Sequence, residues 1–200
     1  MPVMSKVEAA FCRSAPWRAF TARIVVPWVL RGENLAGEVL EIGSGAGANA
    51  AVIAETQPQA QITATDLDPT MVTAARARLE RYGTRATVAE ADSTRLPFDD
   101  DHFDAAVSLL MLHHVIDWEA AIHELARVVR PGGRVVGYDL IATAGARVLH
   151  LADRSPHRLL SRSELDRQLT TSGFQDVDVT PALGGLVARF HATVRASPNE

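Results

Sequence analysis

The chain has 200 residues, a hydrophobic fraction of 47% and a net charge of −4. This length supports one domain with a full hydrophobic core, and the composition is that of an ordinary globular protein. The slightly negative charge argues against a dedicated nucleic-acid binder. Cys12 is the single cysteine, which excludes an internal disulfide and fits a reducing compartment.

We expect a cytoplasmic protein that does not span a membrane. Residues 1–10 mix polar and small side chains and carry no apolar segment of the signal-peptide type. No apolar run approaches the roughly 20 residues that a spanning helix needs. The apolar stretch 24–30 is short, and Pro27 interrupts it.

Residues 1–31 predict an N-terminal helical extension. Pro16 follows a break at residues 14–15, and proline is favoured at the first position of a helix. An aromatic and apolar stripe then recurs at helical spacing: Trp17, Phe20, Ile24 and Trp28. Two interpretations stay open, since the stripe either packs on the rest of the domain or forms a lid over a substrate pocket. Four arginines in this region form either a basic patch or a solvated helix face: Arg13, Arg18, Arg23 and Arg31.

The most informative segment is residues 39–48, an apolar strand that ends in a glycine-rich turn and continues into an alanine-rich helix. Gly43, Gly45 and Gly47 alternate along the turn, and Glu41 lies in the end of the strand. Glycine permits positive φ and lets a ligand approach the backbone, while the following helix offers unpaired N–H groups. The turn therefore predicts a cofactor cradle. The alternative is a tight turn whose glycines serve only packing.

Predicted strands and helices alternate through the rest of the chain. The strands are residues 39–42, 61–65, 86–89, 103–109 and 134–140, and the helices are residues 48–55, 69–81, 118–130 and 161–172. Asp68 and Asp117 are the expected N-caps, and Ser161 with Glu164 forms a capping box. The Pro-Gly-Gly sequence 131–133 is expected to end the helix before it.

Residues 174–180 and 186–194 predict a hairpin whose turn contains Pro181 and two glycines. The complete pattern predicts an α/β protein, with a mostly parallel sheet covered by helices on both faces and an antiparallel C-terminal hairpin. In such sheets ligands bind beyond the carboxyl ends of the strands, where the glycine turn lies.

Asp66 ends the second predicted strand, where a carboxylate can accept hydrogen bonds from both hydroxyls of a ribose. The alternative is a solvated acid at a strand end. Because NAD and S-adenosylmethionine both carry a ribose, this residue alone does not separate them.

Four motifs in order resemble class I S-adenosylmethionine-dependent methyltransferases, in particular the small-molecule branch called type 11. They are E-x-G-x-G-x-G at residues 41–47, Asp92 followed by Leu-Pro-Phe at residues 96–98, Leu-His-His at residues 112–114, and Pro-Gly-Gly at residues 131–133. The resemblance covers about residues 38–140. It implies a Rossmann-like fold with a seven-stranded sheet, S-adenosyl-L-methionine as the cofactor, and in-line methyl transfer to a small-molecule acceptor. Trp17, Trp28 and Phe11 would suit a lipophilic or aromatic acceptor.

The resemblance also implies roles for individual residues. The glycines would admit the amino-acid portion of the donor, Asp66 would hold the ribose, and Asp92 would accept from the adenine amino group. The cofactor-binding residues so implied are Glu41, Gly43, Ser44, Gly45, Gly47, Asp66, Leu67, Asp92, Ser93 and Leu109.

His113 is the candidate catalytic base, since it follows the fourth predicted strand and an imidazole titrates near neutral pH. The alternative is that it packs or caps a loop. A metal site formed with His114 and Asp117 is disfavoured because adjacent histidines rarely converge on one ion, so no metal is expected. Asp139, late in the fifth strand, either borders the substrate pocket or merely ends the strand.

Two other functions are considered. A Rossmann-type NAD(P)-dependent oxidoreductase is disfavoured because the turn lacks the G-x-G-x-x-G spacing and the chain lacks a Tyr-x-x-x-Lys pair. The second is a non-catalytic relative that binds S-adenosylmethionine. We expect one methyltransferase domain over residues 1–200, with a helical extension or lid (1–31), a cofactor-binding core (32–141), and an insertion, helix and hairpin (142–200). The oligomeric state is left open.

Overall fold

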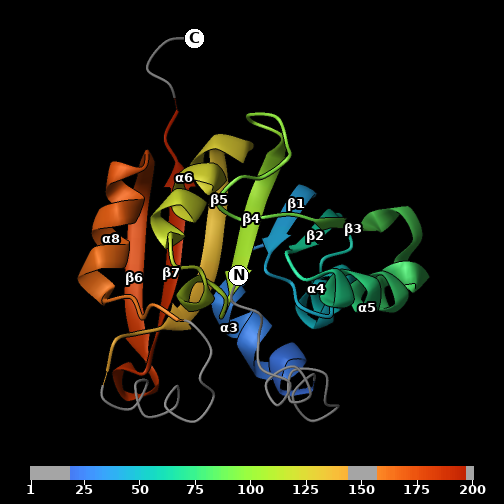
Figure 1. Cartoon of the computed structure of the whole chain (residues 1–200), viewed down its shortest axis with the longest axis horizontal. Helices are drawn as coiled ribbons and strands as arrows, with labels where there is room; N and C mark the ends of the chain where they lie inside the picture. Colours follow the sequence, from blue (N-terminus) through green and yellow to red (C-terminus); the bar gives the residue numbers. More distant parts are fainter. Residues whose placement is uncertain (1–18, 144–156, 197–200) are drawn as a thin grey trace.

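Seven strands form one mixed sheet in the computed structural model, which describes residues 19–143 and 157–196 (Figure 1). The strands are β1 (Gly37–Ile42), β2 (Ala60–Asp66), β3 (Ala86–Glu90), β4 (Phe103–Leu109), β5 (Val129–Leu140), β6 (Phe174–Ala182) and β7 (Val187–Val194). Their order across the sheet is β3-β2-β1-β4-β5-β7-β6. The first five strands are parallel, and β7 runs antiparallel to both β5 and β6. The predicted sheet and its C-terminal hairpin are confirmed.

Helices cover both faces of this sheet (Figure 1). They are α3 (Val26–Leu30), α4 (Ala48–Thr56), α5 (Pro69–Leu79), α6 (Trp118–Val128) and α8 (Arg162–Thr171), with a π-helical turn η1 (Thr21–Val25) and short 3-10 turns η2 (Glu80–Arg85), η3 (Leu112–His114) and η4 (Leu183–Gly185). Apolar residues of α6 and α8 pack on one face of the sheet, and those of α3, α4 and α5 pack on the other. The core therefore consists of two apolar layers, one on each side of the sheet.

The predicted caps are present. The Asp68 carboxylate accepts from the backbone N–H of Thr70 over 2.8 Å, and Ser161 and Glu164 form the complete capping box of α8. Such caps satisfy backbone N–H groups that have no partner within the helix. They fix the starts of α5 and α8 at the predicted places.

Three predicted boundaries are wrong. α6 ends at Val128 rather than at residue 130, and β5 begins at Val129 rather than at residue 134. A residue that precedes proline avoids the helical region, so Pro131 already restricts Arg130, and Val129 pairs with Phe103 across an irregular register. α5 gives way to the 3-10 turn η2 after Leu79.

The prediction for Pro181 is also wrong, because this residue lies within β6 rather than in the hairpin turn. β6 is an edge strand, where a residue without an N–H group is tolerated.

The described residues of the N-terminal stripe differ in burial. Phe20 and Ile24 are 43% and 56% exposed, while Trp28 contacts Tyr138 edge-on at 5.7 Å between ring centroids. The π-helical turn η1 has more residues per turn than an α-helix. Side chains spaced for an α-helix therefore do not fall on one face here. Residues 1–18, with Cys12, Pro16, Trp17 and the first arginines, lie outside the described residues.

Two side chains of β7 fasten the C-terminal end of α3. Arg189 donates to the carbonyl oxygen of Trp28 over 3.2 Å, and Nε2 of His191 lies 2.7 Å from the carbonyl oxygen of Val29. Cationic and N–H-bearing side chains are favourable at this end of a helix because its last carbonyl groups lack intrahelical partners. These contacts hold α3 on the face of β5 and β7.

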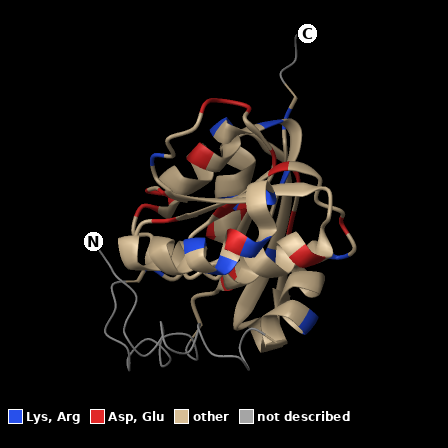
Figure 2. Cartoon of the chain, turned by 90° about the vertical axis from the view of Figure 1, so that its right-hand side faces the viewer, with Lys and Arg blue, Asp and Glu red and all other residues tan. Residues whose placement is uncertain are grey.

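Acidic and basic residues alternate along the elements on the side of the molecule that carries α5 and β3 (Figure 2). Within residues 19–143 and 157–196, no helix combines the length and apolarity that crossing a membrane requires.

Candidate functional site

The glycine turn between β1 and α4 adopts positive φ angles, which would be strained for a residue with a side chain. Gly43, Gly45 and Gly47 have φ values of 61°, 54° and 73°. A Cβ atom at Gly43 would lie 2.7 Å from Cε of Met111, whereas a Cβ atom at Gly45 would meet no atom of the described residues within 4 Å. Gly43 is therefore closely packed, and the backbone at Gly45 borders open space that a ligand can enter.

Three hydrogen bonds join the carboxyl ends of β1, β2 and β3. The backbone N–H of Ser44 donates to the carbonyl oxygen of Thr65 over 2.8 Å, and that of Gly45 donates to Oδ2 of Asp66 over 2.8 Å. The backbone N–H of Ala91 donates to the carbonyl oxygen of Asp66 over 3.0 Å. Ser44 and Gly45 of the turn are thus brought beside the end of β2 with Asp66, and Asp92 follows Ala91 directly in the chain.

The Asp66 carboxylate lies between the glycine turn and the start of α5. Its Oδ1 accepts from the backbone N–H of Asp68 over 2.9 Å while Oδ2 accepts from Gly45. Burial raises the pKa of Asp66, although these backbone N–H groups act in the opposite direction. Each oxygen has a second lone pair, so the carboxylate can still accept from ligand hydroxyls.

Glu41 and Ser44 carry buried polar atoms beside the glycine turn. Among the described residues, no group meets full hydrogen-bond geometry with either carboxylate oxygen of Glu41 or with the hydroxyl of Ser44, although Asn49 and the backbone of Ala50 lie close to the Glu41 carboxyl. Burial raises the pKa of Glu41 to about 8, while Asn49 and the backbone of Ala50 at the start of α4 lower it. Buried polar groups are normally satisfied, so this cluster beside the glycine turn is suited to a polar ligand or water.

The end of β3 carries the second predicted acid. Oδ1 of Asp92 accepts from the backbone N–H and the hydroxyl of Thr94, at 2.9 and 2.7 Å. These bonds form a tight turn and leave Oδ2 of Asp92 without a hydrogen bond among the described residues. Ser93 is half-buried within this turn, and Leu67 after β2 is 36% exposed. The predicted adenine and ribose acids therefore follow adjacent parallel strands.

β4 ends at a strained residue. Leu109 is buried, and Leu110 adopts a φ of 59°, which side chains rarely take. The backbone N–H of Leu110 donates to the carbonyl oxygen of Tyr138 over 2.8 Å, which ties the end of β4 to β5. Strained residues of this kind concentrate at functional sites.

His113 is buried and paired. It is 2% exposed, and its Nδ1 lies 2.5 Å from Oδ1 of Asp139, which is fully buried in β5. Asp139 also accepts from the backbone N–H groups of Leu112 and Leu140, both over 2.7 Å. The sequence left the role of Asp139 undecided, and the pairing was missed because the two residues are 26 positions apart.

His114 packs beside His113 with ring centroids 4.0 Å apart. Among the described residues, no group of three or more His, Cys, Asp or Glu side chains has the geometry of a metal site. Asp117 instead lies at the start of α6, where its carboxylate accepts from the backbone N–H of Ala120 over 3.4 Å.

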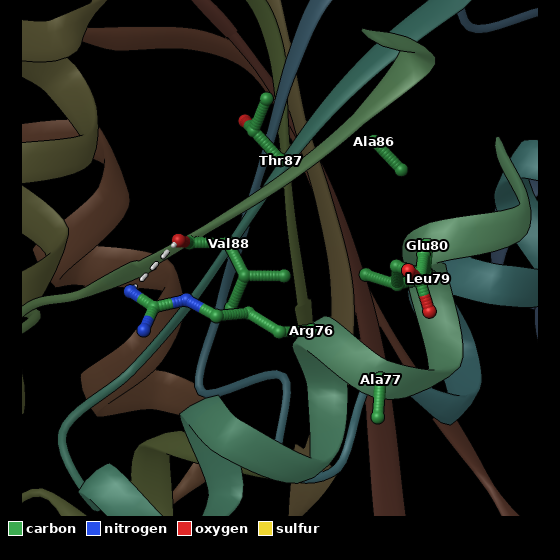
Figure 3. Close-up of a pocket in the computed structure, with 7 residues that line it drawn as sticks. All are labelled: Arg76, Ala77, Leu79, Glu80, Ala86, Thr87 and Val88. Atoms are coloured by element: carbon green, nitrogen blue, oxygen red, sulfur yellow. Dashed lines mark hydrogen bonds between the residues drawn. The ribbon is translucent and has the colours of Figure 1, made fainter. Parts of the chain in front are cut away.

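A surface hollow of about 550 Å³ lies elsewhere, between α5, η2 and the edge strand β3 (Figure 3). Arg76 borders it and donates to the carbonyl oxygen of Val88 over 3.5 Å. None of the predicted cofactor-binding residues lines this hollow.

Known proteins match this chain in sequence and in fold. A family model described as a methyltransferase domain matches residues 40–137. A demethylmenaquinone methyltransferase of Clavibacter sepedonicus is 30% identical over 198 residues, which cover 86% of this chain and 77% of that protein. The O-methyltransferase cnsE of Penicillium expansum is 32% identical over 151 residues, which cover 71% of this chain and 53% of that protein.

A solved structure shows the same fold. It is a Haemonchus contortus phosphoethanolamine N-methyltransferase in complex with S-adenosylhomocysteine, with a TM-score of 0.73 and 15% identity, covering 88% of this chain and 52% of that one. These relatives are methyltransferases, which supports that activity over the alternative of an NAD(P)-dependent oxidoreductase. The chain belongs to the S-adenosylmethionine-dependent methyltransferase family.

Proposed function

We propose that this chain transfers a methyl group from S-adenosylmethionine to a small, lipophilic and aromatic acceptor of the quinol or phenol class. The observation that carries the proposal is the open backbone at Gly45, flanked by the buried carboxyl of Glu41 and by the Asp66 carboxylate. One relative is named for demethylmenaquinone and another as an O-methyltransferase, which supports an acceptor of this class.

We propose that the start of α4 and the glycine turn bind the amino-acid portion of the donor. The N-cap of α4 is Gly47, which has no side chain to cap the helix, so the first N–H groups of α4 are suited to a carboxylate. Glu41 faces the same turn, and a nearby ammonium would favour its ionised form. Gly43, Ser44 and Gly47 would shape this pocket.

We propose that Asp66 accepts from the ribose hydroxyls and that Asp92 accepts from the adenine amino group. Hydroxyl and amino groups are hydrogen-bond donors, which suits the lone pairs that these carboxylates retain. The exposed side chain of Leu67 and the half-buried Ser93 would border the nucleoside. Leu109 would present its backbone at the end of β4.

When bound, the cofactor supplies a methyl group activated by the adjacent sulfonium. The contribution of the chain is then to hold the acceptor in line, since positioning alone can lower a barrier by about 7–11 kcal/mol in favourable cases. We propose that His113 removes the proton of the acceptor, because it lies two residues after Met111, which packs on Gly43.

The experiment is a turnover assay with isotopically labelled S-adenosylmethionine and a set of acceptors that includes naphthohydroquinones, phenols, amines and thiols. Mass spectrometry of the extracts should find the label in a hydroquinone or phenol product. Labelled amine or thiol products alone would contradict the proposed acceptor class, and binding of NADH in place of S-adenosylmethionine would contradict the proposed reaction.

We also propose that residues 1–31 and 142–200 flank the core 32–141 within one domain. The contacts of α3 with β7 and the pairing of β7 with β5 support this organisation. The cytoplasmic location expected from the sequence stays a prediction.

A further inference from the structure

The connection between β3 and β4, residues 91–102, is attached to α6 by the side chain of Arg127. Nη1 of Arg127 donates to the carbonyl oxygen of Phe98 and to Oδ1 of Asp100, both over 2.8 Å. Nη2 donates to the carbonyl oxygen of Leu96 over 3.0 Å. Nε and Nη2 also donate to the two carboxylate oxygens of Glu124, at 2.8 and 2.7 Å. A guanidinium has five N–H donors in a planar fork, so these five bonds use all of them.

Glu124 completes the attachment at Leu96. Its Oε2 accepts from the backbone N–H of Leu96 over 2.7 Å, while the carbonyl oxygen of the same residue accepts from Arg127. The ion pair therefore binds both backbone groups of Leu96, whose side chain is buried. The backbone N–H of Asp101 adds a bond to the carbonyl oxygen of Arg127 over 3.0 Å. Because connecting segments are usually mobile, bonds of this number select one conformation for residues 96–101.

Asp92, the proposed adenine acceptor, lies near the start of the same connection. The backbone N–H of Ala91 donates to the carbonyl oxygen of Asp66, which ties this start to β2. The residues after Asp92 form a closed turn, in which the backbone N–H of Arg95 donates to the carbonyl oxygen of Asp92 over 2.9 Å. Leu96 follows this turn directly. The turn that carries Asp92 is therefore held between two fixed points, one on β2 and one on α6.

Arg127 and Glu124 are both charged near neutral pH. The hydrogen bonds from Arg127 lower the pKa of Glu124 from its ordinary value of 4.5. Their side chains are 32% and 17% exposed, so solvent reaches the pair only in part. Hydrogen bonds that involve ionised groups are shorter and stronger than those between neutral groups. The attachment of residues 96–101 is therefore stronger than a set of neutral contacts would be.

We propose that Arg127 and Glu124 are positioning residues for the nucleobase, which hold the turn of Asp92 so that its carboxylate meets a base with an exocyclic amino group. The inference rests on the proposed function, in which Asp92 accepts from the adenine amino group. Hypoxanthine has a carbonyl oxygen in place of that amino group, so it presents an acceptor to the carboxylate. The pair thus raises the preference of the site for adenine over hypoxanthine, through the backbone of Leu96 rather than by contact with the base.

A purely structural role is the competing explanation, because the pair also joins the connection to α6. That role predicts that replacing Arg127 lowers stability or weakens every ligand of the site by the same factor. The positioning role predicts a selective loss. Affinity for S-adenosylhomocysteine should fall, while affinity for S-inosylhomocysteine, which carries hypoxanthine, should not.

The main test is calorimetric titration of the full chain with these two ligands. Wild type is expected to prefer S-adenosylhomocysteine by about 10-fold or more, since a site built around a donor rejects an analogue that lacks it. Arg127→Lys keeps the charge but not the planar fork. It is expected to weaken S-adenosylhomocysteine by about 10-fold and to change S-inosylhomocysteine by less than about twofold. Glu124→Gln should reduce the preference in the same direction by about threefold, and it decides the question if Arg127→Lys does not fold.

The matched control is Arg130→Lys. Arg130 donates to Oδ1 of Asp104 over 2.7 Å and to the carbonyl oxygen of His102 over 2.6 Å, so its bonds hold the other end of the same connection. This variant should keep the wild-type preference for S-adenosylhomocysteine.

Hydrogen exchange followed by NMR provides a readout that requires no ligand. The amide of Leu96 should be protected in wild type and should exchange at least about 10-fold faster in Arg127→Lys. A Leu96 amide that exchanges freely in wild type would overturn the positioning role.

Asp92→Ala separates this inference from the proposed function. If Asp92→Ala loses the preference for adenine while Arg127→Lys and Glu124→Gln keep it, the positioning role is overturned and the role of Asp92 stands. If Asp92→Ala keeps the wild-type preference, or if wild type has none, the role of Asp92 and the positioning role both fail. Equal weakening of the two ligands in Arg127→Lys would show that the attachment is purely structural.

Discussion

Oδ2 of Asp66 lies 2.8 Å from the backbone nitrogen of Gly45, so the proposed ribose acceptor also holds the middle of the glycine turn. The glycine turn after β1 and the acid at the end of β2 are therefore connected by a hydrogen bond. A change at Asp66 should affect both the nucleoside contact and the shape of the turn.

Asp66→Ala is expected to weaken S-adenosylmethionine binding by about 10- to 100-fold, because hydrogen bonds to a charged acceptor each contribute about 1.5–3 kcal/mol. Calorimetric titration measures the loss. The matched control is Asp68→Ala, which removes the N-cap of α5 and should cost about 1 kcal/mol of stability with little loss of affinity. Equal affinities of Asp66→Ala and wild type would refute the assignment of Asp66.

Gly43→Ala is expected to destabilise the fold for two separable reasons. Its φ of 61° costs a side chain about 1–2 kcal/mol, and the new Cβ would meet Met111 at 2.7 Å. Gly32→Ala has the same backbone strain, at φ 81°, but its new Cβ would meet no atom of the described residues within 4 Å. Urea unfolding should show a larger loss for Gly43→Ala than for Gly32→Ala, and Met111→Ala should recover part of the difference. Equal losses at the two glycines would show that Met111 exerts no packing constraint.

The stability of the chain should depend on pH through Glu41. Burial raises its pKa to about 8 from an ordinary value of 4.5, so between these values the folded state holds a proton that the unfolded state releases. The free energy of unfolding should then fall as pH rises through this window, by up to about 1.4 kcal/mol per pH unit.

Glu41→Gln keeps a neutral side chain at every pH and should remove this part of the dependence, becoming the more stable protein at alkaline pH. Denaturant unfolding across the window compares it with wild type. The same change at the partly exposed Glu38 of β1 serves as the control. A wild-type stability that rises with pH in parallel with Glu41→Gln would contradict the account.

Arg189→Ala is expected to cost about 2–3 kcal/mol, because the buried guanidinium donates to the carbonyl of Trp28 and stacks over its ring at 5.5 Å. The exposed pair of Arg31 and Asp178 provides the comparison, and Arg31→Ala should cost at most about 1 kcal/mol. Thermal unfolding gives the stabilities, and tryptophan fluorescence should report greater solvent contact in Arg189→Ala. Equal costs for the two arginines would argue that β7 does not hold α3.

The sequence predicts those parts of the fold that local patterns determine. The largely apolar run 103–109 follows the acidic turn 99–102, and β4 has the predicted limits. Asp66 could be placed because an acid at the end of a parallel strand must lie beside the turn that ends the neighbouring strand. The start of β5 could not be placed, since Val129 pairs with Phe103 through an irregular register that no local pattern encodes.

The contact between His113 and Asp139 depends on tertiary structure and not on local sequence. His113 and Asp139 meet only because β4 and β5 are neighbours in parallel register, with Leu109 opposite Tyr138. The exposure of Phe20 and Ile24 follows from a π-helical turn, which shifts a periodicity that otherwise predicts burial. A prediction that assumes the regular α-helical repeat cannot reveal where a π-helical turn occurs.

Calorimetric titration of the full chain with S-adenosylmethionine, S-adenosylhomocysteine and NADH tests the central claim most directly. We predict binding of the first two at one site, with a Kd in the micromolar range or below, and no binding of NADH. Asp66→Ala should lose most of this affinity while Asp68→Ala keeps it. Binding of NADH alone, or equal binding of S-adenosylmethionine by Asp66→Ala and wild type, would contradict the account.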